Sequence, residues 1–367
     1  MTAPQNKETR VRVGIIGLSA SGGFAAGAHV PALRALDGYE LRGCSASSAG
    51  SAAAAAAKHD VPLAFGSAEQ LAASDEIDLV VVTVKTPYHH ELVMTALQAG
   101  KTVLCEWPLG NGSAQSAELA AEASRRGLRT AVGLQARSAP WLLYLRDLVA
   151  GGYVGEVLST TIIGSGLSYG AQCPPAARYS IDAANGATML SIPMGHTLDA
   201  ACLVLGEFID FTATLATRRP VVHDTATGEA LPMSVPDQVA VSGRLENGAV
   251  ATVHYRGGLS WATNLHWEIN GTEGDLVVTG PSGHLQLADV QIRGARASDD
   301  GLAELEVPEK YERVPGAAGQ SARVANVAHA YAQLLEDIQT GSSVVPTFEH
   351  AARRHAMLDA IAAADHR

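Results

Sequence analysis

The sequence predicts an α/β protein of two domains. Residues 1–135 are expected to form a doubly wound parallel sheet, and residues 136–367 an α+β domain with a mainly antiparallel, open sheet. Three observations predict this. The 367-residue chain is longer than a single hydrophobic core usually supports. Its first third alternates short apolar runs with helix-like segments, as in parallel sheets. Its second half carries adjoining strand-like stretches with few long helices between them, which is typical of antiparallel sheets.

Composition and charge exclude several classes of protein. A hydrophobic content of 47% with 17% charged residues indicates a packed protein and excludes a disordered one. The formal charge of −11 argues against nucleic acid or an anionic membrane as a partner. The chain starts with the polar stretch MTAPQNKETR, and no apolar run approaches the ~18 residues of a membrane span, so we expect a cytoplasmic protein. The four cysteines are widely spaced without a C-x-x-C pair, which predicts neither disulfides nor a metal site.

The N-terminal stretch has the order strand, glycine turn, helix. Val11–Ile16 is a short β-branched run, and Phe24–Leu36 has the length and small residues of a helix. The turn between them follows the dinucleotide pattern G-x-G-x-x-G, except that a serine replaces the middle glycine. Main-chain amides and the helix N-terminus can hold a diphosphate there, as in a Rossmann domain that binds NAD or NADP. The alternative is a glycine-rich turn that binds nothing. The residues expected to hold the diphosphate are Gly17, Ser19, Ser21 and Gly22.

The end of the second strand, 40–44, leaves the choice between NAD and NADP open. An acidic residue at this place normally binds the adenosine ribose hydroxyls, but here the strand continues as Ser45-Ala46-Ser47-Ser48. No arginine follows to attract a 2′-phosphate. Ser45 and Ser47 can hydrogen-bond to either cofactor.

The clearest buried strand, 77–84, and the strand 101–105 are both followed by polar and aromatic residues. Helices are expected at 52–57, 91–99 and 113–126, and a last strand at 129–134. Ligands of doubly wound sheets bind beyond the carboxyl ends of the strands. We therefore expect cofactor contacts there and place His89 on the surface. The expected contact residues are Thr86, Pro87, His90, Glu106 and Trp107.

The segment TPYHHELVMTALQAGKTVLCEWPLG carries a family resemblance. It resembles the block T-P-x-x-H, A-L-x-A-G-K-x-V, E-K-P of the glucose–fructose oxidoreductase and inositol dehydrogenase family. The stretch GLSASGGFAAGAHVPAL together with EWPL is similar to the subgroup that contains the fungal galactose-pathway repressor, a regulator. The resemblance implies that His90 matches the motif histidine. It also implies an acid–base lysine near the nicotinamide, where this chain has Trp107, whose indole is a donor only.

Strands are expected in the second half at 158–163, 238–245, 249–255, 264–270 and 275–278, and helices at 141–149, 325–341 and 348–364. The hairpin turn Glu246-Asn247-Gly248 supports two of these strands. The family resemblance implies that the open face of this sheet forms an oligomer, a homodimer or homotetramer.

The stretch from Gly186 to Asp199 resembles the family helix G-x-x-L-x-D-x-G-x-H-x-x-D. His196 matches its catalytic histidine and Asp199 the acid three residues later, which can orient the histidine only if the local geometry allows it. The aspartate four residues before the histidine is replaced by Ile192, and we expect Pro193 to break the helical register. The alternative for His196 is a packed or capping histidine.

Lys85 directly follows the apolar strand 77–84. We expect it to be partly desolvated beside the cofactor cleft, which would lower the pKa of its ammonium group toward catalytic use. It could then supply the proton or charge that Trp107 cannot. The alternative is that Lys85 only neutralises the cofactor's pyrophosphate or contacts its ribose.

These observations favour an NAD(P)-dependent oxidoreductase that acts on a sugar or a related polyhydroxylated molecule. His196 is the expected acid–base, assisted by Lys85 and Asp199. One alternative is a non-catalytic, dinucleotide-binding regulator with a protein partner, favoured by Trp107 and by the missing aspartate at 192. Another is a redox-neutral lyase or epimerase that borrows and returns a hydride.

Overall fold

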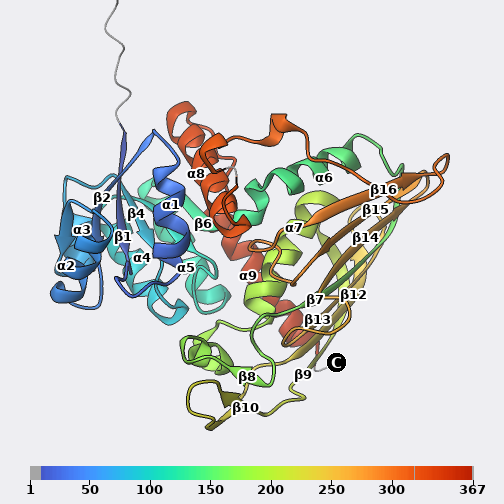
Figure 1. The fold of residues 1–367 in the computed structure, drawn as a ribbon, viewed down its shortest axis with the longest axis horizontal. Coiled ribbons are helices and arrows are strands. Elements are labelled where there is room, and N and C mark those ends of the chain that lie inside the picture. The colour runs from blue at the N-terminus through green and yellow to red at the C-terminus, as the bar shows by residue number, and fades with distance from the viewer. Residues whose placement is uncertain (1–9, 318, 366–367) are drawn as a thin grey trace, which may run out of the picture.

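The computed structural model describes residues 10–317 and 319–365 and confirms the predicted fold class. Figure 1 shows two sheets side by side, the N-terminal one in blue to cyan and the C-terminal one in yellow to orange. Within the described residues, no helix is both long and apolar enough to cross a membrane.

The N-terminal sheet has six parallel strands in the order β3-β2-β1-β4-β5-β6. Because β1 pairs with both β2 and β4, the chain reverses its direction of winding between them, and ligands bind at such a switch point. Its strands are β1 Val11–Ile16, β2 Tyr39–Ser45, β3 Leu63–Phe65, β4 Leu79–Val82, β5 Thr102–Glu106 and β6 Thr130–Gly133. Its helices are α1 Val30–Arg34, α2 Ala49–Lys58, α3 Ala68–Ala73, α4 His89–Gln98 and α5 Ser113–Arg126.

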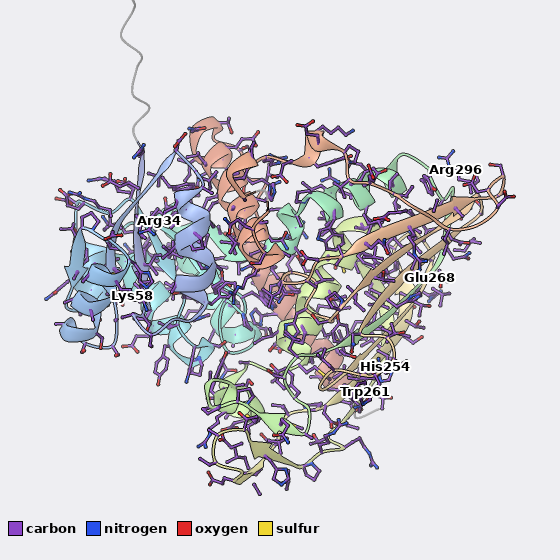
Figure 2. The ribbon with its side chains drawn as sticks, viewed as in Figure 1. Arg34, Lys58, His254, Trp261, Glu268 and Arg296 are labelled. Atoms are coloured by element: carbon purple, nitrogen blue, oxygen red, sulfur yellow. The ribbon has the colours of Figure 1, made fainter. Side chains whose placement is uncertain are left out.

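The C-terminal sheet has eight strands in the order β17-β16-β15-β14-β7-β13-β12-β9. All neighbours are antiparallel except β13 and β7, which pair in parallel. Figure 1 shows α6, α7 and α9 on one side of this sheet, and Figure 2 shows His254 and Glu268 on the side away from them. The strands are β7 Val157–Ser165, β9 Phe208–Ala216, β12 Gln238–Leu245, β13 Val250–Arg256, β14 Leu265–Gly271, β15 Gly274–Gly280, β16 Gln291–Arg296 and β17 Ala303–Glu304.

A small third sheet and four helices complete the fold. The small sheet has the order β11-β10-β8, with β8 Gln172–Cys173, β10 Val221–Asp224 and β11 Ala230–Pro232. The helices are α6 Pro140–Ala150, α7 Gly195–Leu205, α8 Ala322–Thr340 and α9 Phe348–Ala364. Helix α8 packs on α1, and α9 packs on α5 and β9. The two domains that we propose, 1–135 and 136–367, therefore share an interface formed in part by the C-terminal helices.

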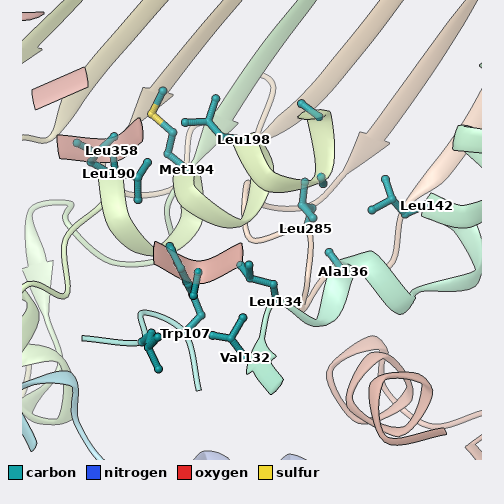
Figure 3. Close-up of a cluster of buried hydrophobic side chains, with 14 of the residues drawn as sticks. Trp107, Val132, Leu134, Ala136, Leu142, Leu190, Met194, Leu198, Leu285 and Leu358 are labelled. Atoms are coloured by element: carbon teal, nitrogen blue, oxygen red, sulfur yellow. The ribbon is translucent and has the colours of Figure 1, made fainter. Parts of the chain in front are cut away.

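The core continues across this interface around Trp107. Figure 3 shows its indole in one buried cluster with Met194, with Leu198 of α7 and with Leu358 of α9. The register change expected at Pro193 takes the form of one π-helical turn, Leu190–Met194, which runs directly into α7. The wider turn accommodates a residue that has no N–H to donate.

Candidate functional site

The glycine turn after β1 has an open outer side. Gly17 has a φ of +100°, and a Cβ there would lie 2.8 Å from Cγ1 of Val84, so the turn needs glycine. Gly22 has a φ of +117°, and a Cβ there would meet nothing within 4 Å. The hydroxyls of Ser19 and Ser21 lie 2.9 Å apart. This geometry fits a diphosphate, which needs main-chain approach and hydroxyl donors.

The two serines expected at the adenosine ribose differ in exposure. Ser45 is buried, and its main-chain oxygen accepts a hydrogen bond of 2.9 Å from the amide of Gly17, which fixes the glycine turn to β2. Ser47 is exposed beyond the end of the strand. Of the two side chains, only that of Ser47 is therefore open to a ligand.

A cavity of about 390 Å³ lies between the carboxyl ends of β4 and β5 and the segments 168–196 and 284–287. Its size is within the range of small-molecule and cofactor sites. It adjoins the glycine turn, because Gly17 packs against Thr83 and Val84, which line it. Its lining residues include Val84, Thr86, His89, Glu106, Trp107, Gln135, Tyr179, His196, His284 and Gln286.

Four residues that the sequence singled out line this cavity: Thr86, Glu106, Trp107 and His196. Pro87, His90, Lys85 and Asp199 are not among its lining residues. The sequence therefore predicted the position of the cavity correctly, but only some of the residues that line it.

His89 replaces His90 at the cavity, so the surface position expected for His89 is wrong. His89 is 1% exposed, and its ring nitrogens lie 2.7 Å from the oxygen of Pro108 and 2.9 Å from that of Val84. The ring of His90 instead pairs with Glu118 at 2.9 Å. Helix α4 begins at His89, and one residue along a helix rotates the side chain by about 100°, which turns His90 away from the sheet.

The burial expected for Lys85 is also wrong. Strand β4 ends at Val82, so Lys85 lies beyond the buried part of the strand and is exposed. Its ammonium nitrogen lies 5.0 Å from the centre of the Tyr179 ring, a cation–π contact. Because Tyr179 lines the cavity, Lys85 contacts the cavity wall from outside.

Trp107 is held by two contacts. Its Nε1 donates a hydrogen bond of 2.6 Å to the main-chain oxygen of Ser191, and its ring lies 4.5 Å from that of His355. The single N–H of the indole is therefore already used in joining β5 to the π-helical turn before α7.

Glu106 belongs to a hydrogen-bonded chain that the sequence did not reveal. Nε2 of Gln135 donates to both of its oxygens, at 2.9 and 2.8 Å. Nε2 of His29 lies 3.1 Å from Oε1, and Nδ1 of the same ring lies 2.8 Å from the hydroxyl of Tyr331. Gly133 leaves room for this carboxylate, because a Cβ there would lie 2.5 Å from Oε1. His29 and Gln135 gave no signal because their partners are 77 and 29 residues away.

His196 is buried at the cavity wall, and its Nδ1 has no hydrogen-bond partner among the described residues. Burial and the neighbouring His284 lower the pKa of His196 to about 3, against the opposite effect of Asp199. The ring is thus neutral at neutral pH, because burial disfavours its protonated form.

Asp199 does not bind His196 directly. Its Oδ1 lies 2.6 Å from Nε2 of His350, 3.3 Å from Nη1 of Arg137 and 3.4 Å from Nε of Arg354. Burial alone would raise the pKa of Asp199, but Arg137, His350 and Arg354 together hold it well below its usual range. Through these contacts Asp199 joins α7 to α9 and to the turn at 135–138.

Sequence reasoning also missed His284 and Gln286. Both line the cavity from the irregular segment between β15 and β16, where no periodicity or motif marks them.

The comparisons with known proteins match this geometry. Residues 11–134 match the oxidoreductase family with an NAD-binding Rossmann fold, and residues 140–280 match the C-terminal domain of Gal80p. The dehydrogenase aclE of Aspergillus oryzae is 34% identical over 290 residues, which cover 74% of this chain and 78% of that protein. The chain belongs to this oxidoreductase family.

Two further proteins that resemble this chain differ in what their names say they do. The galactose/lactose metabolism regulatory protein GAL80 of Saccharomyces cerevisiae is 28% identical over 315 residues, 80% of this chain and 72% of that protein. The crystal structure of a super-repressor mutant of it has a TM-score of 0.87 at 25% identity and covers 98% of this chain and 96% of that one. Levoglucosan dehydrogenase, solved with NADH and levoglucosan, shares the fold with a TM-score of 0.81 at 23% identity, covering 98% of both chains.

Family membership confirms the resemblance that the motifs indicated, including the Gal80-like C-terminal domain. It also gives the coarse cofactor class, since the family's Rossmann domain is NAD-binding. The glycine turn of this chain fits such a cofactor by its own geometry. Because the family contains both a dehydrogenase and a regulator, membership leaves the activity of this chain to be argued from its own residues.

Proposed function

We propose that the protein is an NAD(P)-dependent oxidoreductase that acts on a sugar or a related polyhydroxylated molecule. The observation that carries this proposal is the position of His196, a buried and neutral imidazole at a cavity that adjoins the glycine turn. A protein that only bound the dinucleotide would not need a neutral imidazole with a buried nitrogen left without a partner.

The dinucleotide would be held by the residues of the glycine turn and by the carboxyl ends of β2, β4 and β5. We assign Gly17, Ser19, Ser21 and Gly22 to the diphosphate and Ser47 to the adenosine ribose. Thr86, Glu106 and Trp107 line the deeper cavity. Ser45, Pro87 and His90 would support these contacts from behind rather than touch the cofactor. When bound, the nicotinamide supplies the hydride chemistry.

We assign the proton transfer to His196, which can take a proton from a substrate hydroxyl or return it. Asp199 acts as a positioning residue, because its ion pairs fix α7 and with it His196. Lys85 positions Tyr179 at the cavity wall. The lysine normally found in the E-K-P motif has no counterpart here, since Trp107 already donates to Ser191.

The hydrogen bond from Trp107 to Ser191 favours a second candidate, a dinucleotide-binding regulator with a protein partner. A residue fixed in this way holds the two domains together and takes no part in proton transfer. Similarity to the GAL80 regulators supports the same candidate. A redox-neutral lyase or epimerase would use the same cavity and the same histidine.

The test is to incubate the protein with NAD or NADP and a panel of sugars and to follow the absorbance of the reduced cofactor. We expect turnover with at least one sugar, and a loss of about 10²–10⁴-fold in His196→Asn. His223→Asn, which alters an exposed histidine of β10, is the control and should keep full activity. Cofactor binding without turnover across the panel would favour the regulator, and a changed sugar without net reduction would favour the redox-neutral reaction.

We also propose that the protein forms a homodimer or homotetramer through the outer face of the eight-stranded sheet. The face that points away from the helices carries four exposed residues, none of which is Asp, Glu, Lys or Arg: Thr161, Ser242, Thr252 and His254. Light scattering of the protein and of Thr252→Arg tests this, because a buried arginine at the centre of the face should dissociate the oligomer.

A further inference from the structure

Several residues that line the cavity carry buried polar atoms without a partner in the described part of the chain. Among the described residues, four that line the cavity carry five buried side-chain nitrogen and oxygen atoms without a hydrogen-bond partner. A buried polar atom without a partner is costly, so such atoms mark a place built to meet a polar ligand. The five atoms are Oε1 of Gln135, Nδ1 of His196, Nδ1 and Nε2 of His284, and Oε1 of Gln286.

The segment that carries His284 is fixed in place. The hydroxyl of Tyr255 donates to the main-chain oxygen of Gly283 at 2.9 Å, and the amide of Gly283 donates to the oxygen of Ser165 at 2.7 Å. Three residues further, Nδ2 of Asn326 donates to the main-chain oxygen of Gln286 at 2.9 Å. The unpartnered side chains are therefore presented by an ordered backbone and are not loop ends without support.

The same tyrosine joins this segment to the helix of His196. The hydroxyl of Tyr255 also contacts the hydroxyl of Thr197 at 2.5 Å. Because the Tyr255 hydroxyl donates to Gly283, it accepts from Thr197. Thr197 follows His196 directly in α7, so one hydrogen-bonded unit fixes His196 and His284 relative to each other.

The chemistry of this wall is uncharged. Burial lowers the pKa of His284 to about 4, and both imidazoles are neutral at neutral pH. A neutral imidazole offers one donor and one acceptor, and an amide oxygen accepts, which matches hydroxyl groups that both donate and accept. No lysine or arginine is among the lining residues, whereas the carboxylate of Glu106 is. An anionic ligand would therefore meet no cation there.

We propose that His284 and Gln286 form, beside His196, the binding wall for the substrate, and that this wall selects an uncharged ligand with adjacent hydroxyls over its acid or phosphorylated form. This inference rests on the proposed function and specifies its substrate class. His284 is a specificity-determining residue in this assignment, and His196 keeps the proton transfer.

The experiment is calorimetric titration of the NAD-loaded protein with matched probes: D-glucose and myo-inositol, with gluconate and glucose 6-phosphate as anionic counterparts. We expect a neutral probe to bind at least about tenfold more tightly than either anion. His284→Phe removes both ring nitrogens at similar volume and should weaken neutral binding by about tenfold or more. His284→Asn keeps a donor and an acceptor and should lose less. The control is His223→Phe, which makes the same change at an exposed histidine outside the cavity.

Affinity for NAD, measured for each variant, separates this inference from the proposed function. If NAD binds and neutral probes bind without turnover, the oxidoreductase assignment fails and the inference stands. Tighter binding of gluconate or glucose 6-phosphate than of the neutral probes would overturn the inference. So would equal binding of the neutral probes by His284→Phe and the unaltered protein, or no binding of either neutral probe when NAD binds.

Discussion

The indole Nε1 of Trp107 donates a 2.6 Å hydrogen bond to the main-chain oxygen of Ser191. Ser191 is itself fixed, because its hydroxyl donates to the oxygen of Gly186 at 2.7 Å and accepts from the amide of Thr188 at 2.8 Å. The end of β5 is thereby tied to the turn that leads into α7. Trp107 is therefore a structural link between the parallel sheet and the helix of His196.

The link predicts a stability difference between two tryptophan variants. Trp107→Phe should lower the free energy of unfolding more than Trp141→Phe does, by about 1–2 kcal/mol, because it leaves the half-buried main-chain oxygen of Ser191 without its donor. Trp141 is a matched control, since it is also buried and its Nε1 has no partner among the described residues. Urea denaturation of both variants measures the difference. Equal losses would show that the hydrogen bond from Trp107 contributes nothing to stability.

Lys85 gives a prediction about turnover. Its ammonium group is exposed and contacts the Tyr179 ring from outside the cavity, so Lys85→Met should change kcat by no more than about twofold. KM should rise a few-fold, because Tyr179 is less ordered without the cation, and Lys85→Arg should restore KM, because arginine keeps the cation over the ring. Steady-state kinetics with a substrate from the sugar panel measures both constants. A fall of about 100-fold in kcat would instead make Lys85 an acid–base residue.

Asp199 gives a prediction about stability. Asp199→Asn removes the buried carboxylate that Arg354, Arg137 and His350 share, while Glu207 still pairs with Arg354, and should cost up to about 3–5 kcal/mol of unfolding free energy. Asp210→Asn removes an exposed partner of Arg244 and should cost less than about 1 kcal/mol. Chemical denaturation at neutral pH compares the two. Similar small losses in both variants would mean that the ion pairs of Asp199 do not stabilise the position of α7.

The fold was predictable because local patterns carried it. Strand β1 and helix α5 begin and end at the residues predicted from apolar periodicity and from glycine positions. Both signals depend only on neighbouring residues in the sequence. The sequence also predicted α8 and α9 as helices. It did not predict that they pack against α1 and α5, which cover the parallel sheet. Packing of α8 on α1 joins residues about 300 apart, for which a single sequence holds no signal.

The candidate site was predictable only where a motif named a residue. His196 and Trp107 were found in this way and do line the cavity. His89 was placed on the surface because the sequence does not say which of two adjacent histidines faces the sheet, and only the start of α4 decides it. His284 and Gln286 lie in an irregular segment, and their relation to His196 exists only through the tertiary contacts of Tyr255.

His355 gives the last prediction, a loss of stability in mild acid. Burial lowers the pKa of His355 to about 4, against the opposite effect of Asp359, whereas in the unfolded chain the pKa is about 6.5. Between these values the unfolded chain binds the proton and the folded protein does not, so stability falls as pH drops from about 6.5 toward 4. Between pH 7 and 5 this histidine should account for about 2 kcal/mol, since each pH unit within the window is worth about 1.4 kcal/mol. His355→Gln should therefore lose less stability over that range than the unaltered protein in urea denaturation. His223→Gln, at an exposed position, should follow the unaltered protein, and an unchanged pH slope in His355→Gln would show that folding does not lower the pKa of His355.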